Sequence, residues 1–128
     1  MNTAEKGRRK EVECLKEYKE YLEKSRATKV KDTWHTTRTH RGGNDMFNDF
    51  DLAFLVYWQP TSELTIPELH FIQVKSIFSF AYYMKLKQKY EGGAFKVFLA
   101  VYEQKEPSRS VRADNITKLK SFNLYRVN

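Results

Sequence analysis

The sequence predicts an α/β protein of one domain, residues 1–128, with a mixed central sheet flanked by helices. Three observations lead to this prediction. Residues 10–24 and 79–91 have the apolar spacing of amphipathic helices, three strand-like segments follow the first helix, and another follows the second. The order α-β-β-β-α-β places a helix between two strands, which is typical of a mixed sheet with helices packed on it.

The first helix is predicted over residues 10–24, "KEVECLKEYKEYLEK". Charged residues fill most of this segment, and a narrow stripe recurs at helical spacing. The stripe consists of Glu11, Leu15, Tyr18 and Leu22, with Val12 beside it. Cys14 has no histidine at motif spacing and is expected to be inert. As the single cysteine it cannot form an intrachain disulfide, and this favours a reducing, intracellular setting.

Three strands are expected next. Residues 33–40, "TWHTTRTH", are rich in threonine and aromatic residues, and residues 47–58 become strongly apolar from Phe50 onward. A loop with two prolines, 59–68, separates the latter from a strand over 69–75, which we expect to pair antiparallel with it.

The second half of the chain adds one helix and one further long strand. Glycines 92 and 93 end the helix over 79–91, as glycine after a helix should. Phe80, Tyr83, Met84 and Leu86 are its expected apolar face. The remaining segments are a strand over 94–103, a basic loop over 104–114, a short helix in "NITKLKS" (115–121) and a last strand over 122–127.

The charge is unevenly distributed. The net charge is +7, and residues 1–31 carry 10 basic against 6 acidic side chains. The middle of the chain, residues 32–70, is acidic instead, with six acids against two arginines. A basic surface indicates a polyanionic partner, and a local acidic cluster can bind a divalent cation. The alternative is a soluble protein whose charge is merely uneven.

Four polar residues lie where apolar ones are expected. Asp51 enters an apolar strand, Gln73 and Lys75 lie two positions apart in "HFIQVKS", and Glu11 begins the stripe of the first helix. Acids and lysines are rarely buried unless they are paired or bind a metal. Each has a plainer explanation: Asp51 could begin its strand in water, Gln73 could bond a neighbouring backbone, and Lys75 could lie where its strand reaches solvent.

The order of these residues resembles the PD-(D/E)XK nuclease superfamily, especially the archaeal Holliday junction resolvases. "KGRRKEVECL" is similar to their first helix, "FDLAFLV" to their Asp-Leu strand, and "HFIQVKS" to their E-x-K strand. "KQKYEGGAFKVFLAVY" and "FNLYRVN" are similar to their second helix and later strands. The resemblance implies a restriction-endonuclease-like core and catalytic roles for Glu11, Asp51, Gln73 and Lys75.

By the same resemblance, Mg²⁺, or Mn²⁺ in its place, binds Asp51, Gln73 and the Val74 carbonyl, with Glu11 completing the site. Two positions depart from the pattern: Phe50 precedes Asp51, and Gln73 stands where an acid is usual. Some branches, including Mrr-like restriction nucleases, carry Q-x-K. A glutamine still offers a carbonyl oxygen, but it brings no negative charge, so metal affinity should fall.

The implied function is metal-dependent hydrolysis of phosphodiester bonds in duplex or branched DNA by a homodimer. The expected location is the cytoplasm, near the nucleoid, or a host cell if the protein is viral. No segment is apolar for long enough to cross a membrane. Specificity is expected in loops 33–46, 59–68 and 104–114. Expected DNA-binding residues are Arg8, Arg9, Arg38, His40, Arg41, Lys85 and Lys89.

Two other functions remain open from the sequence. One is a nucleic-acid-binding protein that keeps the nuclease fold but has lost turnover because of Gln73. The other is a protein–protein adaptor whose acidic patch is only a surface. A metal site formed by His35 and His40 is a further alternative, although these residues could equally be exposed or contact phosphate beside Arg38 and Arg41.

Overall fold

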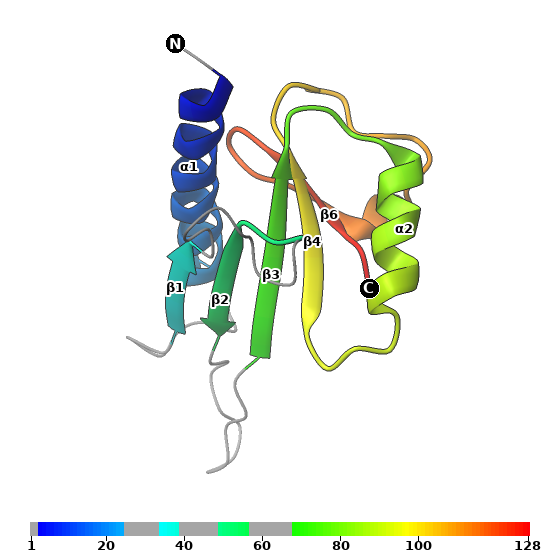
Figure 1. Cartoon of the computed structure of the whole chain (residues 1–128), viewed down its shortest axis with the longest axis horizontal. Coiled ribbons are helices and arrows are strands. Elements are labelled where there is room, and N and C mark those ends of the chain that lie inside the picture. The colour runs from blue at the N-terminus through cyan, green and yellow to red at the C-terminus, as the bar shows by residue number, and fades with distance from the viewer. Residues whose placement is uncertain (1–2, 25–33, 39–48, 57–67) are drawn as a thin grey trace.

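The fold is a six-stranded mixed sheet with one long helix on each face, seen in a computed structural model that describes residues 3–24, 34–38, 49–56 and 68–128 (Figure 1). The helices are α1 (Thr3–Lys24) and α2 (Phe80–Tyr90). The strands are β1 (Trp34–Arg38), β2 (Leu52–Val56), β3 (Glu68–Lys75), β4 (Lys96–Val101), β5 (Ile116–Lys118) and β6 (Asn123–Arg126). The predicted α/β class is therefore confirmed.

The strand order is β1-β2-β3-β4-β6-β5. β1, β2 and β3 pair antiparallel, which confirms the expected pairing of β2 with β3. α2 connects β3 to β4, and these two strands run parallel. β6 and β5 then extend the sheet antiparallel beyond β4. Because β3 and β4 run in the same direction, their carboxyl ends lie together at one end of the sheet, the upper end in Figure 1.

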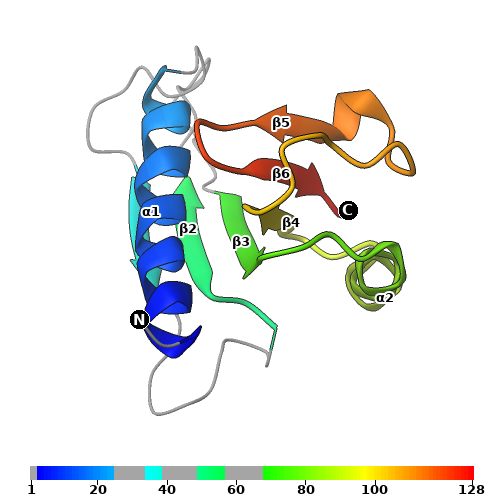
Figure 2. The ribbon, with the colours of Figure 1, turned by 90° about the horizontal axis from the view of Figure 1, so that it is seen from above.

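α1 covers one face of the sheet. Its buried residues Cys14, Tyr18 and Leu22 pack against Leu52 and Phe54 of β2, together with residues of β3, β4 and β6. Alternate residues of a strand point to opposite faces, so the even-numbered positions of β2 form this core. Figure 2 shows α1 lying along the sheet near β2. Val12 was expected beside the apolar stripe but is 52% exposed, because the buried side of the helix is centred on Cys14 and Tyr18.

α2 covers the opposite face. Tyr83, Leu86 and Tyr90 recur at helical spacing and are buried against Ala53, Phe71, and residues of β4 and β6. Ser79 caps the helix by accepting a hydrogen bond from the backbone N–H of Tyr82 (3.2 Å). Phe80, predicted on the apolar face, is 45% exposed because it lies in the first turn, before the helix reaches the sheet. The molecule therefore has three layers, helix, sheet and helix.

The predicted helix over 115–121 is wrong. A single 3₁₀ turn at Ala113–Asn115 precedes strand β5, in which Ile116 pairs with Tyr125 and Lys118 with Asn123 of β6. Ile116 and Thr117 are β-branched, which favours an extended backbone. The open edge of β6 supplies the backbone partners that an isolated two-turn helix would lack.

The two last long strands, whose ends are both described, are shorter than predicted. The β4 strand, for example, was expected over 94–103 and covers Lys96–Val101. Residues 39–48 and 57–67, which include most of the expected specificity loops 33–46 and 59–68, lie outside the described residues. Among the residues that the structure describes, no helix has the length and apolarity needed to cross a bilayer.

One buried polar group, His70 of β3, lies between the sheet and α1. His70 is 2% exposed, its Nδ1 lies 2.7 Å from the Tyr18 hydroxyl, and its Nε2 lies 2.9 Å from Glu68 Oε1. Burial lowers the pKa of His70, although the Glu68 hydrogen bond opposes this, and the charges of Lys96 and Arg126 lower it further. His70 is therefore expected to be neutral inside the folded protein at neutral pH.

We expect stability to fall as the pH drops from about 7 to about 5, because the unfolded chain protonates His70 more readily than the folded protein does. In a His70→Gln variant this dependence should be weaker, even if its stability at neutral pH is lower. Urea unfolding of both proteins across this range measures the difference. Equal slopes of stability against pH in the two proteins would show that His70 is not responsible.

Candidate active site

Gln73 and Lys75 lie at the end of β3, where that strand extends beyond β2. The β2–β3 ladder ends at the pair Leu52–Ile72, followed by a last bond from the Asp51 N–H to the Ile72 carbonyl (3.0 Å). β3 continues to Lys75, whereas the chain before β2 turns away toward α2 (Figure 1). On the β2 side, the end of β3 therefore lies beside the Asp51 side chain, whereas on the other side Gln73, Val74 and Lys75 still pair with β4.

Asp51 replaces the missing strand as a hydrogen-bond acceptor. Its side chain is buried, with an exposed fraction of 6%, and its Oδ2 accepts the backbone N–H of Val74 at 2.8 Å. With its amide oriented so that the nitrogen faces the acceptors, Gln73 donates to the same Oδ2 at 3.1 Å and to the carbonyl of Asp49. The structure thus brings Asp51 and Gln73 into direct contact, as the sequence order predicts.

The Val74 carbonyl faces the same side. The Lys75 carbonyl accepts the N–H of Tyr102, which follows β4, so it points away from β2. Successive carbonyls of a strand point in opposite directions, and that of Val74 therefore points toward Asp51, beyond the last ladder pair. A carboxylate, an amide and a backbone carbonyl are together at this end of the sheet.

These donors fit Mg²⁺ in kind, because magnesium prefers oxygen ligands and commonly takes only one or two carboxylates from the protein. The Gln73 amide would have to turn over to present its oxygen. No group of three or more His, Cys, Asp or Glu side chains suitable for a metal occurs within the described residues. The oxygens that the structure brings together here are those of one carboxylate, Asp51, and of neutral groups.

Lys75 lies on the same face of β3 as Gln73 and is exposed. Its Nζ is 5.1 Å from the centre of the Tyr82 ring, which reaches over from α2. Burial raises the pKa of Tyr82 to about 12, and the charges of Asp49 and Asp51 add to this effect. Tyr82 is thus a neutral phenol at the edge of the site. Its ring lies against Lys75, the one cationic side chain among the four expected catalytic residues.

Asp49 was missed as a site residue. Its carboxylate accepts a hydrogen bond from Lys89 Nζ at 2.6 Å and another from the Tyr90 hydroxyl, both on α2. Burial raises the pKa of Asp49, but these two hydrogen bonds and the charges of Lys89 and Lys85 together outweigh it and leave the pKa lowered. The available signal was its position two residues before Asp51. The ion pair also changes the expected role of Lys89, which holds Asp49 in this structure.

Glu11 approaches from the other layer. It lies on α1, one turn before the buried Cys14, and it is partly exposed. The pKa of the Cys14 thiol is raised, first by burial, then by the charges of Glu17 and Asp51, and to a smaller degree by those of Glu13 and Glu11. Asp51 and Glu11 are therefore both within electrostatic reach of Cys14, from the sheet and from the helix. The raised pKa also agrees with an inert thiol.

The predicted DNA-binding residues have different outcomes. Arg8 and Arg9 are exposed on α1, and Lys85 is exposed on α2. The strand β1 contains Arg38, but its side chain is not among those described, and His40 and Arg41 lie outside the described residues.

Comparison with models of known families, with curated proteins and with solved structures finds no match to this chain.

Replacing Asp51 should separate its structural role from its charge. Asp51→Ala leaves the Val74 N–H and the Gln73 amide without their acceptor and should cost about 1–3 kcal/mol of stability. Asp51→Asn keeps an acceptor oxygen and should cost less. Urea unfolding in EDTA measures both variants. An alanine variant as stable as the wild type would contradict the role of this carboxylate as a replacement for the strand partner.

Proposed function

We propose that the protein is a metal-dependent DNA endonuclease with a restriction-endonuclease-like core, acting on branched or otherwise structured DNA. The observation that carries this proposal is the contact of Asp51 with Gln73 and with the Val74 peptide, at the point where β3 extends beyond β2. Lys75 lies on the same face of β3 as Gln73. Polar groups of this kind are costly to bury, and here they are gathered at the open end of a sheet.

Asp51, the Val74 carbonyl and the amide oxygen of Gln73, once it has turned over, would hold Mg²⁺ or Mn²⁺. Glu11 would complete the site directly or through water. When bound, the metal lowers the pKa of a coordinated water and neutralises charge on the phosphate. Lys75 places its ammonium beside the attacking water and the phosphate oxygens. Hydrolysis breaks the P–O3′ bond and leaves a 5′-phosphate and a 3′-hydroxyl.

Tyr82 and Asp49 support this arrangement from α2. The Tyr82 ring lies against Lys75 and limits the space available to the ammonium. Asp49 binds Lys89 and Tyr90, and its carbonyl accepts from Gln73, so it fixes the chain that leads into Asp51. Two such sites in a homodimer would suit symmetric cuts in a four-way junction. β4 lies between β3 and β6 and is largely buried, so the end of α2 is the remaining candidate for the interface.

A second candidate is a nucleic-acid-binding protein without turnover. It is favoured by the hydrogen bond from Gln73 to Asp51, which satisfies the carboxylate in the absence of metal. A glutamine at this position also leaves the site with one negative charge fewer than a usual E-x-K site.

Cleavage of a four-way junction and of a linear duplex, each with Mg²⁺, Mn²⁺ or EDTA, tests the first candidate. Metal-dependent cleavage should fall by about 100-fold or more in Asp51→Asn and Lys75→Ala, because charge and proton transfer at the phosphate depend on them. Lys87→Ala, another exposed lysine, should retain activity and serves as the control. Binding without cleavage in either metal would favour the second candidate, and no binding at all would exclude both.

Gln73→Glu tests metal binding without relying on activity. In EDTA the new carboxylate loses the donated hydrogen bonds and repels Asp51, so the melting temperature should fall below that of the wild type. Mg²⁺ should raise it again, and by more than in the wild type, because a second carboxylate strengthens the site. The control is Asp51→Asn, whose melting temperature Mg²⁺ should leave nearly unchanged. If Mg²⁺ shifts none of the three, the metal site assigned to these residues is wrong.

A further inference from the structure

A second basic feature lies at the same end of the sheet as the candidate active site but on the α1 side. It is a pocket of ≈ 370 Å³, formed where α1, the segment after β4 and the turn between β5 and β6 meet. We call it the lysine pocket. Its principal lining residues are Lys10, Lys105, Lys118, Lys120, Tyr102 and Phe122, and no acid is among its lining residues.

The positive charge of this pocket is largely uncompensated. Lys105, Lys118 and Lys120 are exposed and make no ion pair with any described residue. Lys10 is the exception, since its Nζ lies 3.3 Å from Glu13 Oε2. Two further acids lie nearby: Glu17 is buried and accepts the backbone N–H of Ser121 at 2.7 Å, and Glu103 is paired with Lys6 at 2.7 Å. Three free ammonium groups therefore surround one pocket.

An aromatic ring forms part of the wall. The Tyr102 ring packs edge-on against Phe122, with centroids 6.0 Å apart. Lys10 Nζ lies 5.2 Å from the Tyr102 centroid and Lys6 Nζ lies 5.8 Å from it. The aromatic face thus holds Lys10 at the pocket, whereas Lys6, which is paired with Glu103, is not a lining residue.

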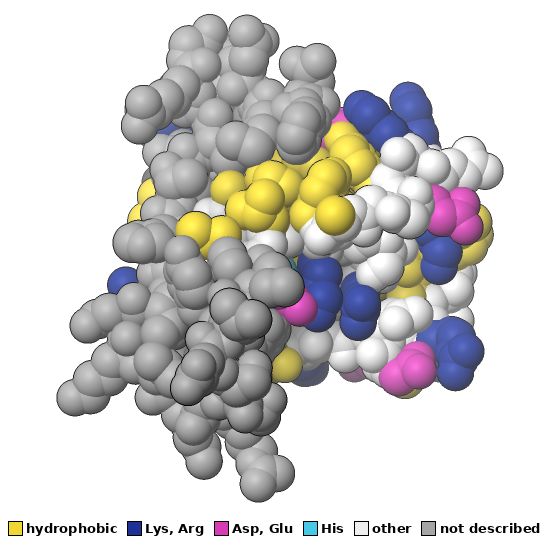
Figure 3. Space-filling model, turned by 90° about the horizontal axis from the view of Figure 1, so that it is seen from below, with side chains coloured by type: hydrophobic (Ala, Val, Ile, Leu, Met, Phe, Trp, Pro, Cys, Tyr) yellow, Lys and Arg dark blue, Asp and Glu magenta, His cyan; other side chains and the backbone are white. Residues whose placement is uncertain are grey.

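The opposite end of the molecule carries a different surface. Seen from that end, hydrophobic side chains gather in one patch, and basic side chains lie beside acidic ones (Figure 3). Lys96 and Glu68, 3.1 Å apart, are one such pair near the start of β3 and β4. Single lysines elsewhere, such as Lys16 and Lys87, also make no ion pair with a described residue, but the lysine pocket brings three of them to one place.

The sheet connects the lysine pocket to the candidate active site. Lys75 pairs with Val101, Val101 with Asn123, and Asn123 with Lys118, so these residues form one row across β3, β4, β6 and β5. Three steps of ~4.8 Å place the Cα atoms of Lys75 and Lys118 about 14 Å apart. At a rise of ~3.4 Å per nucleotide, this corresponds to about four nucleotides of a DNA strand.

We propose that the lysine pocket binds backbone phosphates of the DNA strand, about four nucleotides from the phosphate at the candidate active site. A lysine ammonium is a compact charge that binds phosphate oxygens and does not distinguish between bases. This contact therefore positions the DNA strand and adds affinity that is independent of the DNA sequence. The placement relative to the cut rests on the proposed function. The phosphate contact itself requires no cleavage.

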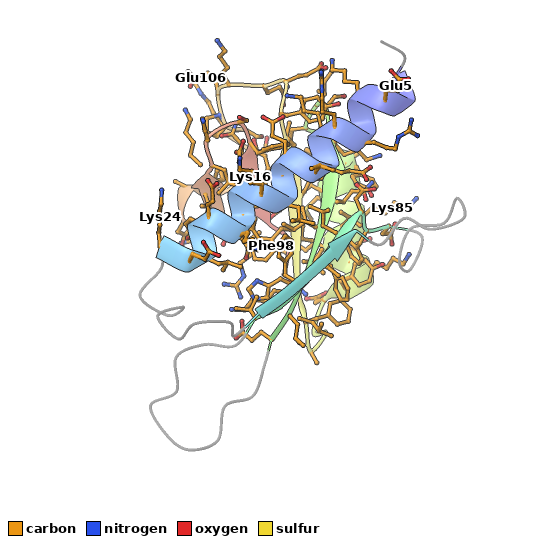
Figure 4. All side chains as sticks on the ribbon, turned by 90° about the vertical axis from the view of Figure 1, so that its left-hand side faces the viewer. Glu5, Lys16, Lys24, Lys85, Phe98 and Glu106 are labelled. Carbon is orange, nitrogen blue, oxygen red and sulfur yellow. The ribbon has the colours of Figure 1, made fainter. Side chains whose placement is uncertain are left out.

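The test compares the Lys118→Ala/Lys120→Ala variant with the wild type in fluorescence anisotropy on a labelled duplex and a four-way junction, in EDTA, over a series of salt concentrations. Each lost phosphate contact should lower the slope of log affinity against log salt by ~0.9, so the slope should fall by about two. The charge-matched control is the Lys16→Ala/Lys24→Ala variant. Both lysines are exposed on α1, do not line the lysine pocket, and lie along the helix away from the end of the molecule where Glu5 and Glu106 are labelled (Figure 4). The slope of this control should equal that of the wild type.

Several results would overturn the proposal: an unchanged slope in the Lys118/Lys120 variant, an equal fall in the control, or no salt-dependent DNA binding by the wild type. Melting temperatures of both variants verify that they are folded. Cleavage is measured separately with Mg²⁺. If the wild type cleaves DNA and the Lys118/Lys120 variant has an unchanged slope, the phosphate contact at the lysine pocket is refuted but the nuclease is not. If the slope falls in this variant and the wild type does not cleave, the nuclease is refuted and phosphate binding at the lysine pocket is supported.

Discussion

The hydrogen bond from the Val74 N–H to Asp51 Oδ2 is the interaction on which the candidate site depends. β3 is longer than β2, and a buried strand end with unpaired backbone groups would be costly. Asp51 satisfies the first of these groups with a side chain, which leaves the chain before it free to turn toward α2. That turn allows Asp49 to reach Lys89 and Tyr90. Removing the carboxylate would therefore disturb both the end of the sheet and the contact with α2.

The two helices contribute to this end of the sheet in different ways. α2 supplies cations and phenols, and it places the Tyr82 ring against Lys75 and the Lys89 ammonium against Asp49. α1 supplies charge from the other face, with Glu11 one turn before Cys14 and Lys10 beside Tyr102. Negative groups thus converge between β2, β3 and α2, whereas unpaired positive groups gather between α1 and β5. A phosphodiester strand needs both, an anionic pocket for a metal and cations for its flanking phosphates.

Periodicity in the sequence was sufficient to find both helices, although α1 begins at Thr3 and not at residue 10. The β2–β3 pairing and the contact between Asp51 and Gln73 were expected from the order of the strands and of their polar residues. Periodicity failed at "NITKLKS", where the open edge of β6 decides in favour of a strand. It also missed Asp49 and the lysine pocket. The role of Asp49 depends on a turn toward α2, and the pocket joins Lys10 to Lys118 across the sheet; neither follows from the spacing of residues along the chain. The end of β3 beyond β2, which creates the site, was also missed, because β2 was predicted from residue 47 and begins at Leu52.

Gln73 determines how tightly a metal could bind. Its amide nitrogen donates to Asp51 and to the Asp49 carbonyl, so the metal-free site is already satisfied. To offer its oxygen to Mg²⁺, the amide must give up both bonds, and the energy of these bonds is subtracted from the binding energy of the metal. A glutamate in this position would have the opposite balance, with repulsion in the metal-free site and stronger binding afterwards. If the proposed chemistry is right, metal occupancy should therefore increase when DNA is present, because a phosphate oxygen supplies the negative charge that Gln73 lacks. The lysine pocket would then assist the metal indirectly, by keeping that phosphate in place.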